Sequence, residues 1–219
     1  MYSFTTLNIR GYDDKPVANT FIKQDAGTES LAVLFPGMRY TTDMPLLYYT
    51  SRLFVAGGAD ALLVDYRYHE DADFMAAGEQ ERARRLTGDV TAACRVALSQ
   101  RSYRDVTVVG KSIGSLAMAH LLSTEAKLST ARAVWLTPLL RNDNLRAQIK
   151  TWGGKSLFVI GTADHDYDEA LLKEVEAATR GKSLVIEGGD HLLEVEGDFF
   201  ASLQALEKIL RAVRRFDTE

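Results

Sequence analysis

Apolar runs and apolar helical stripes alternate along this chain from residue 31 onward. Short runs rich in Val, Leu, Ile and Phe suit strands buried on both faces, and apolar positions spaced three or four residues apart suit helices that cover a sheet. The pattern predicts strands at residues 31–35, 61–66, 105–109, 133–136, 156–160 and 183–186, and helices at 44–55, 79–98, after 112, around 145–149, at 168–179 and at 198–216. This alternation is typical of an α/β fold with a mostly parallel, doubly wound sheet.

The first thirty residues follow a different pattern. Residues 3–10 and 16–24 alternate loosely around a turn-rich tetrapeptide at 11–14, which predicts an antiparallel hairpin. Antiparallel strands are therefore expected only at the N-terminal edge of the sheet.

Two finer predictions concern individual helices. Asp43 is a residue type that caps helices well, and it stands before the helix at 44–55. The apolar residues of the last helix are expected to form one stripe: Phe199, Leu203, Leu206, Leu210 and Val213.

Length and composition favour one ordinary globular domain over residues 1–219. The chain has 46% apolar and 26% charged residues, without a repeat or a long linker. Only about 15 residues lie between Leu140 and the strand that starts at Ser156, too few for an inserted helical domain. We therefore expect no cap domain and an open site.

Charge and cysteine content exclude several classes of protein. The net charge is −4 with both signs interspersed, so we expect neither nucleic acid nor a membrane as a partner. The single Cys94 lies on the apolar side of a predicted helix and is expected to be a core residue. No leader pattern and no long apolar run is seen, which predicts a cytoplasmic protein.

The sequence Gly110-Lys111-Ser112-Ile113-Gly114 joins a buried strand to a helix. A serine on so sharp a turn is forced towards positive φ, and the two glycines leave room for that turn. Its hydroxyl then projects from the sheet, and the Ile113 N–H points towards an anion formed beside it. The motif predicts a nucleophile elbow at Ser112, the alternative being a serine that only caps the helix. A phosphate-binding P-loop is excluded, because Asp105 stands where that loop needs glycine.

A carboxylate and an imidazole follow two later strands. Asp164 comes shortly after the strand at 156–160, and His191 shortly after the strand at 183–186. With Ser112 they give the chain order Ser, Asp, His that is expected for a catalytic triad on a nucleophile-elbow sheet. We predict that Ser112 is the nucleophile, His191 the base and Asp164 the group that orients it, with Asp166 and Asp190 as alternative orienting residues.

Through the Ser112 motif, Gly161-Thr162-Ala163-Asp164 and Gly189-Asp190-His191, the chain resembles the α/β-hydrolase fold superfamily over nearly its full length, in particular its small lidless members. The resemblance implies an oxyanion hole formed by the N–H groups of Met38 and Ile113. Pro36 departs from the pattern, since many relatives have His before that loop's glycine.

The expected function is hydrolysis of a carboxylic ester or thioester with a small or exposed acyl group, through an acyl-serine intermediate. The substrate is a small molecule, and we expect no cofactor and no metal, because Glu169 stands where a calcium loop beginning at Asp164 would need glycine. The alternatives are a peptidase or amidase with the same triad, and a catalytically silent binding module of the same fold.

Three basic residues near the predicted strand ends are candidates for binding an anionic group of the substrate. Arg39 directly follows Met38, and Arg67 and His69 follow the strand at 61–66. An arginine fork suits a carboxylate or phosphate, and the alternative is a set of solvated surface residues.

Overall fold

Residues 1–218 are described by a computed structural model, in which the chain divides into two compact units. The first unit is Met1–Val106, and the second begins at Thr107. Each unit contains its own strands and helices, so each is described by itself.

The strands of the first unit follow the order β1-β2-β4-β3. They are β1 (Tyr2–Thr5), β2 (Asn19–Gln24), β3 (Ser30–Phe35) and β4 (Asp60–Val64). β2 pairs antiparallel with both β1 and β4, whereas β3 and β4 are parallel. The antiparallel strands are thus the N-terminal ones, as expected.

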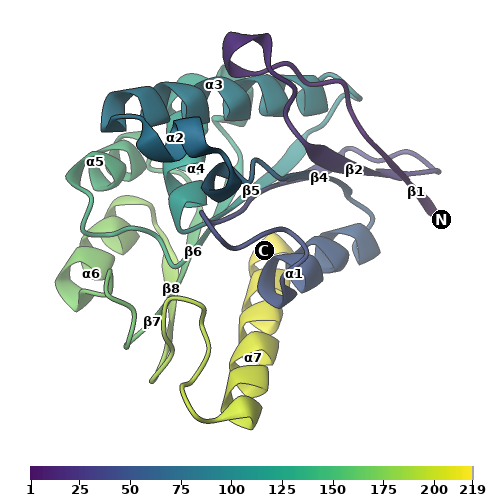
Figure 1. Cartoon of the computed structure of the whole chain (residues 1–219). Helices are drawn as coiled ribbons and strands as arrows, with labels where there is room; N and C mark the ends of the chain where they lie inside the picture. The colour runs from purple at the N-terminus through teal and green to yellow at the C-terminus, as the bar shows by residue number, and fades with distance from the viewer. Residues whose placement is uncertain (219) are drawn as a thin grey trace. The chain divides into compact units, whose positions relative to one another are not determined.

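The helices of the first unit cover both faces of these strands. They are α1 (Pro45–Ala56), α2 (Ala72–Ala76) and α3 (Glu79–Leu98), with the 3-10 turns η1 (Tyr12–Asp14) and η2 (Tyr68–Glu70) between other elements. α1 and α3 lie on opposite faces of the strands (Figure 1).

The second unit is parallel throughout its paired strands. They are β5 (Asp105–Lys111), β6 (Arg132–Leu136), β7 (Ser156–Gly161) and β8 (Lys182–Ile186), in that spatial order. Its helices are α4 (Ile113–Thr124), α5 (Asp143–Trp152), α6 (Glu169–Ala178) and α7 (Phe199–Thr218), with a 3-10 turn η3 (Ala126–Leu128). Figure 1 shows α6 and α7 on opposite sides of β7 and β8.

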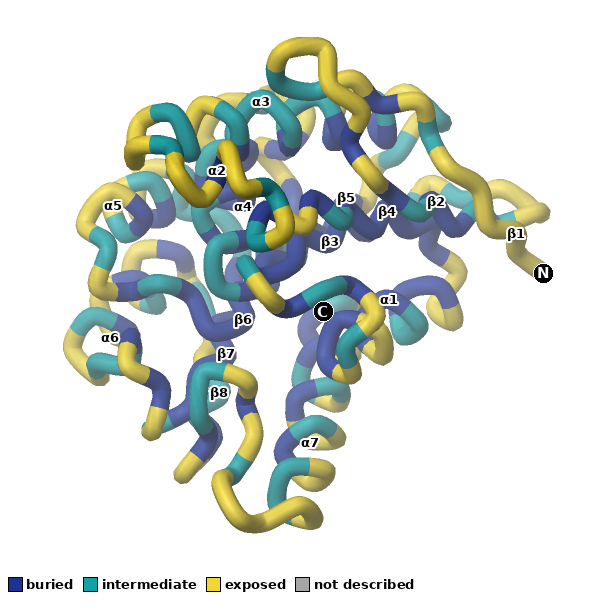
Figure 2. The backbone as a smooth tube through the Cα atoms, viewed as in Figure 1, coloured by how far each residue is buried: buried dark blue, intermediate teal, exposed yellow. Residues whose placement is uncertain are grey.

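Burial follows the strand pattern in each unit. The central strands are buried along most of their length, and β1 is exposed (Figure 2). In the second unit Trp135 is fully buried, stacks on Phe158 at 5.9 Å between ring centroids, and donates its indole N–H to the Ser156 hydroxyl at 3.1 Å. The indole N–H of Trp135 is therefore paired inside an otherwise apolar region.

Most predicted elements are confirmed, but the N-cap of α1 is not Asp43. The N-cap is Met44, which makes no side-chain cap hydrogen bond and is followed by Pro45 at the first helical position. Proline favours this position because it needs no N–H partner, and it keeps the preceding residue extended. The Met-Pro pair thus sets the helix start one residue later than Asp43 requires.

The predicted apolar stripe of α7 is also wrong in part. The buried residues of α7 are Ala205, Ile209, Val213 and Phe216. Phe199 and Leu203 are 70% and 47% exposed, so the first turn contributes no buried side chain to the core. Ala205 and Ile209 are buried where Leu206 and Leu210 were expected, so apolar spacing gave neither the start of the contact nor the exact face.

Cys94 is fully buried on α3, as predicted. Among the described residues, none of the helices combines the length and apolar character that crossing a membrane would need.

Asp60, at the start of β4, is the centre of a buried polar cluster in the first unit. Its side chain is fully buried and accepts hydrogen bonds from the Gln24 N–H at 2.7 Å and the Tyr103 hydroxyl at 2.6 Å. The Arg101 guanidinium lies 3.0 Å from the same carboxylate. Asp60 therefore connects β2 and β4 to the segment that follows α3.

We predict that Asp60→Ala lowers the free energy of unfolding by about 3–5 kcal/mol, because it leaves the Arg101 charge and two donors without their partner. Urea unfolding measures the change. Glu207→Ala, which removes an exposed ion pair with Arg211 on α7, is the control and should have little effect. Equal effects of the two substitutions would contradict the prediction.

Candidate active site

The turn between β5 and α4 has the geometry of a nucleophile elbow. Ser112 has φ 54° and ψ −118°, a conformation that a residue with a Cβ rarely adopts. A Cβ on Gly110 would lie 2.5 Å from the carbonyl oxygen of Gly114, so the strand and the helix approach too closely for any larger residue. A glycine is therefore required at position 110.

The hydroxyl of Ser112 does not cap the helix. No side-chain cap hydrogen bond is formed at the start of α4, and the Ser112 Oγ instead lies 2.9 Å from His191 Nε2. The contact joins residues 79 positions apart in the sequence. It favours a reactive serine over the helix-capping alternative.

His191 lies in a tight loop after β8. The Asp190 carboxylate accepts hydrogen bonds from the Leu192 and Glu194 N–H groups, at 2.8 and 3.0 Å, and so closes the loop. Gly161, the last residue of β7, allows the loop to pass close by, because a Cβ there would overlap the carbonyl oxygen of Gly189. The position of the imidazole thus depends on backbone packing at the end of β7.

Asp164 follows β7 and contacts the other ring nitrogen of His191. Its two carboxylate oxygens lie 3.0 and 2.9 Å from His191 Nδ1, and its side chain is fully buried. Burial acts to raise the pKa of Asp164, but the hydrogen bonds from His191 and from the Asp166 N–H outweigh it, so the pKa lies below its ordinary value. The carboxylate therefore stays ionised at neutral pH.

The two alternative orienting carboxylates have other partners. Asp190 is engaged with the backbone of its own loop. Asp166 lies 3.0 Å from His165 Nε2. Of the three predicted carboxylates, Asp164 is the one whose contact with the His191 ring is seen.

Asp164, His165, Asp166 and His191 also form a cluster that could hold a metal ion. One ligand atom from each of the four residues lies within 4.8 Å of the others, and two imidazoles with two carboxylates are donors that zinc accepts. These groups already contact one another: Asp164 contacts His191, and Asp166 contacts His165. We assign the contacts to the Ser112 site and no metal to the cluster.

The other predicted residues belong to the first unit. Met38 is half-buried and Arg39 exposed in the loop after β3, where the Gly37 N–H donates to the Tyr40 carbonyl and the Pro36 carbonyl accepts from the Tyr66 hydroxyl. These two bonds define the shape of the loop at Pro36.

Arg67 and His69 follow β4, and each has an acidic neighbour. Arg67 Nε lies 2.8 Å from Asp65, and Arg67 Nη1 and His69 Nε2 lie 3.6 and 3.5 Å from Glu70. These carboxylates offset the positive charge that was expected to attract an anion. The contacts weaken the case for Arg67 and His69 as substrate-binding residues.

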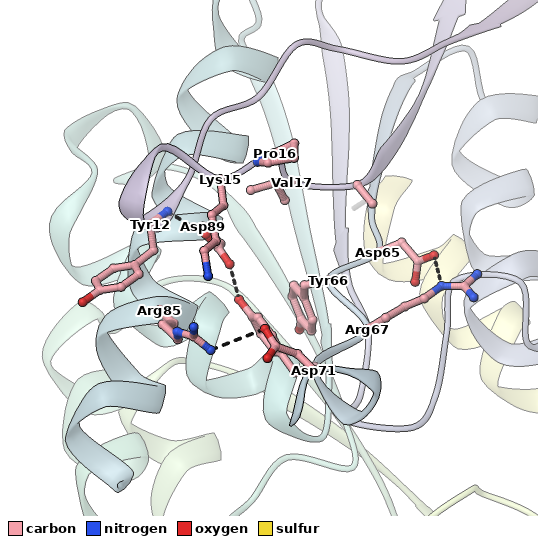
Figure 3. Close-up of a pocket in the computed structure, with 12 residues that line it drawn as sticks. Tyr12, Lys15, Pro16, Val17, Asp65, Tyr66, Arg67, Asp71, Arg85 and Asp89 are labelled. Atoms are coloured by element: carbon pink, nitrogen blue, oxygen red, sulfur yellow. Dashed lines mark hydrogen bonds and ion pairs between the residues drawn. The ribbon is translucent and has the colours of Figure 1, made fainter. Parts of the chain in front are cut away.

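A pocket of about 260 Å³ lies beside Arg67 in the first unit (Figure 3). Its charged residues pair among themselves: Arg85 with Asp71 at 3.4 Å, and Arg67 with Asp65. Asp89 accepts from the Tyr68 hydroxyl at 2.7 Å, and burial raises its pKa. The pocket is thus lined by internally balanced charges, and no ligand is assigned to it.

Sequence reasoning missed one residue next to the site. Lys111, the residue before Ser112, is buried, and its ammonium donates to the Thr137 hydroxyl and the His191 carbonyl. The signal available in the sequence was a lysine ending an otherwise apolar strand, which is an unusual place for a charge.

No family model and no curated protein matches the chain. Several solved structures, in contrast, are similar to it. An esterase from Pyrococcus furiosus has a TM-score of 0.74 at 13% identity, covering 98% of this chain and 90% of its own. A dienelactone hydrolase from Anabaena variabilis has a TM-score of 0.69 at 15% identity, covering 98% and 96%.

A third similar structure is a predicted CIB-like hydrolase from Thermoplasma acidophilum, with a TM-score of 0.64 at 18% identity. The match covers 98% of this chain and 100% of that hydrolase. Similarity at these identities shows a common fold. Because the matches extend over nearly the whole of both chains, no inserted domain separates this chain from them.

We predict that Gly161→Ala lowers the free energy of unfolding by about 1–3 kcal/mol, because the added methyl group must displace the loop that carries His191. Urea unfolding measures this loss. Gly78→Ala is the control, since a Cβ there meets nothing within 4 Å at an ordinary φ of −69°. The prediction fails if both substitutions are equally mild.

Proposed function

We propose that this chain, which has the α/β-hydrolase fold, is a serine hydrolase that cleaves a carboxylic ester or thioester through an acyl-serine intermediate. The observation that carries the proposal is the continuous contact from Ser112 Oγ to His191 Nε2 and from His191 Nδ1 to Asp164. The esterases among the similar structures support the choice of an ester.

In this proposal His191 is the general base and later the general acid. Its Nε2 takes the proton of the Ser112 hydroxyl as the oxygen attacks the acyl carbonyl, and it returns the proton to the leaving alcohol or thiol. Asp164, ionised and buried, holds the proton on Nδ1 and stabilises the imidazolium. Water then attacks the acyl-serine by the same route and releases the acid.

The oxyanion of the tetrahedral intermediate needs hydrogen-bond donors near Ser112. Ile113 is the first residue of α4, so its N–H has no acceptor within the helix and can serve as one donor. Met38 as the second donor rests on the resemblance alone.

The substrate is proposed to be a small molecule with a small or exposed acyl group. The connection from β6 to β7 consists of α5 and two short loops, without an inserted domain. A connection this short favours an open site. The contacts among the three side chains also favour an enzyme over a silent binding module, because an inactive protein has no need to keep them aligned.

We predict that Ser112→Ala leaves the melting temperature nearly unchanged and lowers kcat for p-nitrophenyl esters by at least about 10⁴-fold, because the nucleophile is lost. A panel of esters of graded chain length, run beside acyl-CoA thioesters and aminoacyl amides, identifies the substrate for this measurement. Labelling by a fluorophosphonate probe should disappear in the same variant. Activity within tenfold of the parent would place the nucleophile elsewhere.

We predict that Asp164→Asn lowers kcat by about 10⁴-fold, because an amide at this position favours the wrong imidazole tautomer. Asp166→Asn and Asp190→Asn are the matched controls, and each should retain activity within about tenfold of the parent. If Asp190→Asn had the largest effect, Asp164 would not be the orienting residue.

A further inference from the structure

Lys111 is a buried lysine directly before the proposed nucleophile. It ends β5 and is 1% exposed, although lysine is among the residue types least often found fully buried. A buried ammonium is costly unless hydrogen bonds and opposite charges surround it. The contacts of its Nζ atom therefore indicate what the residue does.

The ammonium of Lys111 connects three strand ends of the second unit. Nζ donates to Thr137 Oγ1 at 3.0 Å, directly after β6, and to the main-chain carbonyl of His191 at 2.6 Å, in the loop after β8. Charge-assisted hydrogen bonds of this length are among the strong ones. The backbone at His191 is thus held from the same strand that presents Ser112.

Thr137 supports this reading. It is fully buried and has φ 43°, which is strained for a β-branched residue. Its backbone N–H donates to Val159 at 2.7 Å, so β7 holds it in that conformation while its hydroxyl accepts from Lys111. Strain of this kind persists where neighbours fix it, and it gathers at functional sites.

Two carboxylates offset the charge of Lys111. Burial lowers the pKa of Lys111 to about 8, and the charges of Asp164 and Asp190 act in the opposite direction. At neutral pH the side chain is therefore mostly an ammonium.

We propose that Lys111 is a positioning residue for the hydrolase: it holds the main chain of His191 so that the imidazole reaches Ser112 and Asp164 together. The inference rests on the proposed function. Lys111 acts through the main chain of His191, whose carbonyl accepts a hydrogen bond from the ammonium. A buried ammonium costs free energy that its hydrogen bonds must offset, and the bonds of Lys111 join the end of β5 to Thr137 and to the His191 main chain.

The test is Lys111→Met, which keeps the length of the side chain and removes the ammonium. We expect kcat to fall about a hundredfold and KM to change less than about threefold, because displacement of the base affects the reaction more than binding. Lys127→Met, at an exposed lysine on η3, is the matched control and should behave as the parent.

A second readout does not depend on turnover. The His191 Nδ1–H proton bonded to Asp164 should give a low-field NMR resonance in the parent and in Lys127→Met, and that resonance should be lost or broadened in Lys111→Met. If no ester is cleaved by the parent, the proposed function fails, and the resonance still decides the role of Lys111. An unchanged resonance with kcat within threefold of the parent overturns the inference.

Thermal unfolding tests whether the role of Lys111 is purely structural. A lysine whose pKa is lowered on folding binds fewer protons in the folded state between pH 8 and 10.5, so its cost to stability is full below about pH 8 and falls as pH rises through this window. The melting temperature of Lys111→Met relative to the parent should therefore be highest below about pH 8 and should fall as pH rises towards 10.5. If melting temperature and kcat fall together while the resonance persists, Lys111 is structural only and the inference is wrong.

Thr137→Val provides an independent variant should Lys111→Met not fold. It removes one acceptor of the ammonium and keeps the β-branched shape. We expect a smaller loss of kcat, about tenfold, because the bond to the His191 carbonyl remains. Full activity with an unchanged resonance in this variant counts against the inference.

Discussion

The strained turn at Ser112 is the constraint on which the site depends. A positive φ at a residue with a Cβ costs about 1–3 kcal/mol and persists only where the surroundings fix it. Here the close approach of Gly110 to Gly114 and the hydrogen bond from the Ser112 N–H to the Leu136 carbonyl fix it. Because β5 to β8 are parallel, their carboxyl ends share one edge, and the remaining polar side chains reach the serine from there. The strand ends and the tight loops that follow them together set the geometry.

The sequence was most informative where local and tertiary preferences agree. α3 begins and ends where its apolar spacing indicates, at Glu79 and Leu98, and its buried residues follow that spacing from Leu86 to Leu98. Asp43 and the Met44-Pro45 pair favour different N-cap positions for α1, and the propensities of these residues alone do not decide between them. The predicted stripe of α7 shares only Val213 with the buried face, because several apolar positions of this helix fit more than one helical stripe and only the packing shows which one is buried.

At the candidate site, residue type and chain order predicted Ser112, Asp164 and His191, since the chemistry limits the choice to few residues, and the three side chains contact one another in the structure. Lys111 escaped because a lysine in a sequence is normally assigned to the surface. Its environment is formed by residues 26 and 80 positions away, and such contacts exist only in the folded chain. The carboxylates beside Arg67 and His69 were visible in the sequence, but their pairing depends on the turn that follows β4.

Cys94 and the tryptophans offer separate reporters for the two units. The chain's one cysteine lies fully buried in the first unit, and both tryptophans, Trp135 and Trp152, lie in the second. A thiol reagent can reach Cys94 only when α3 opens, so its labelling rate follows openings of the first unit. Indole fluorescence reports on openings of the second unit. Comparing the two signals during unfolding would show whether the units open in one cooperative step or in sequence.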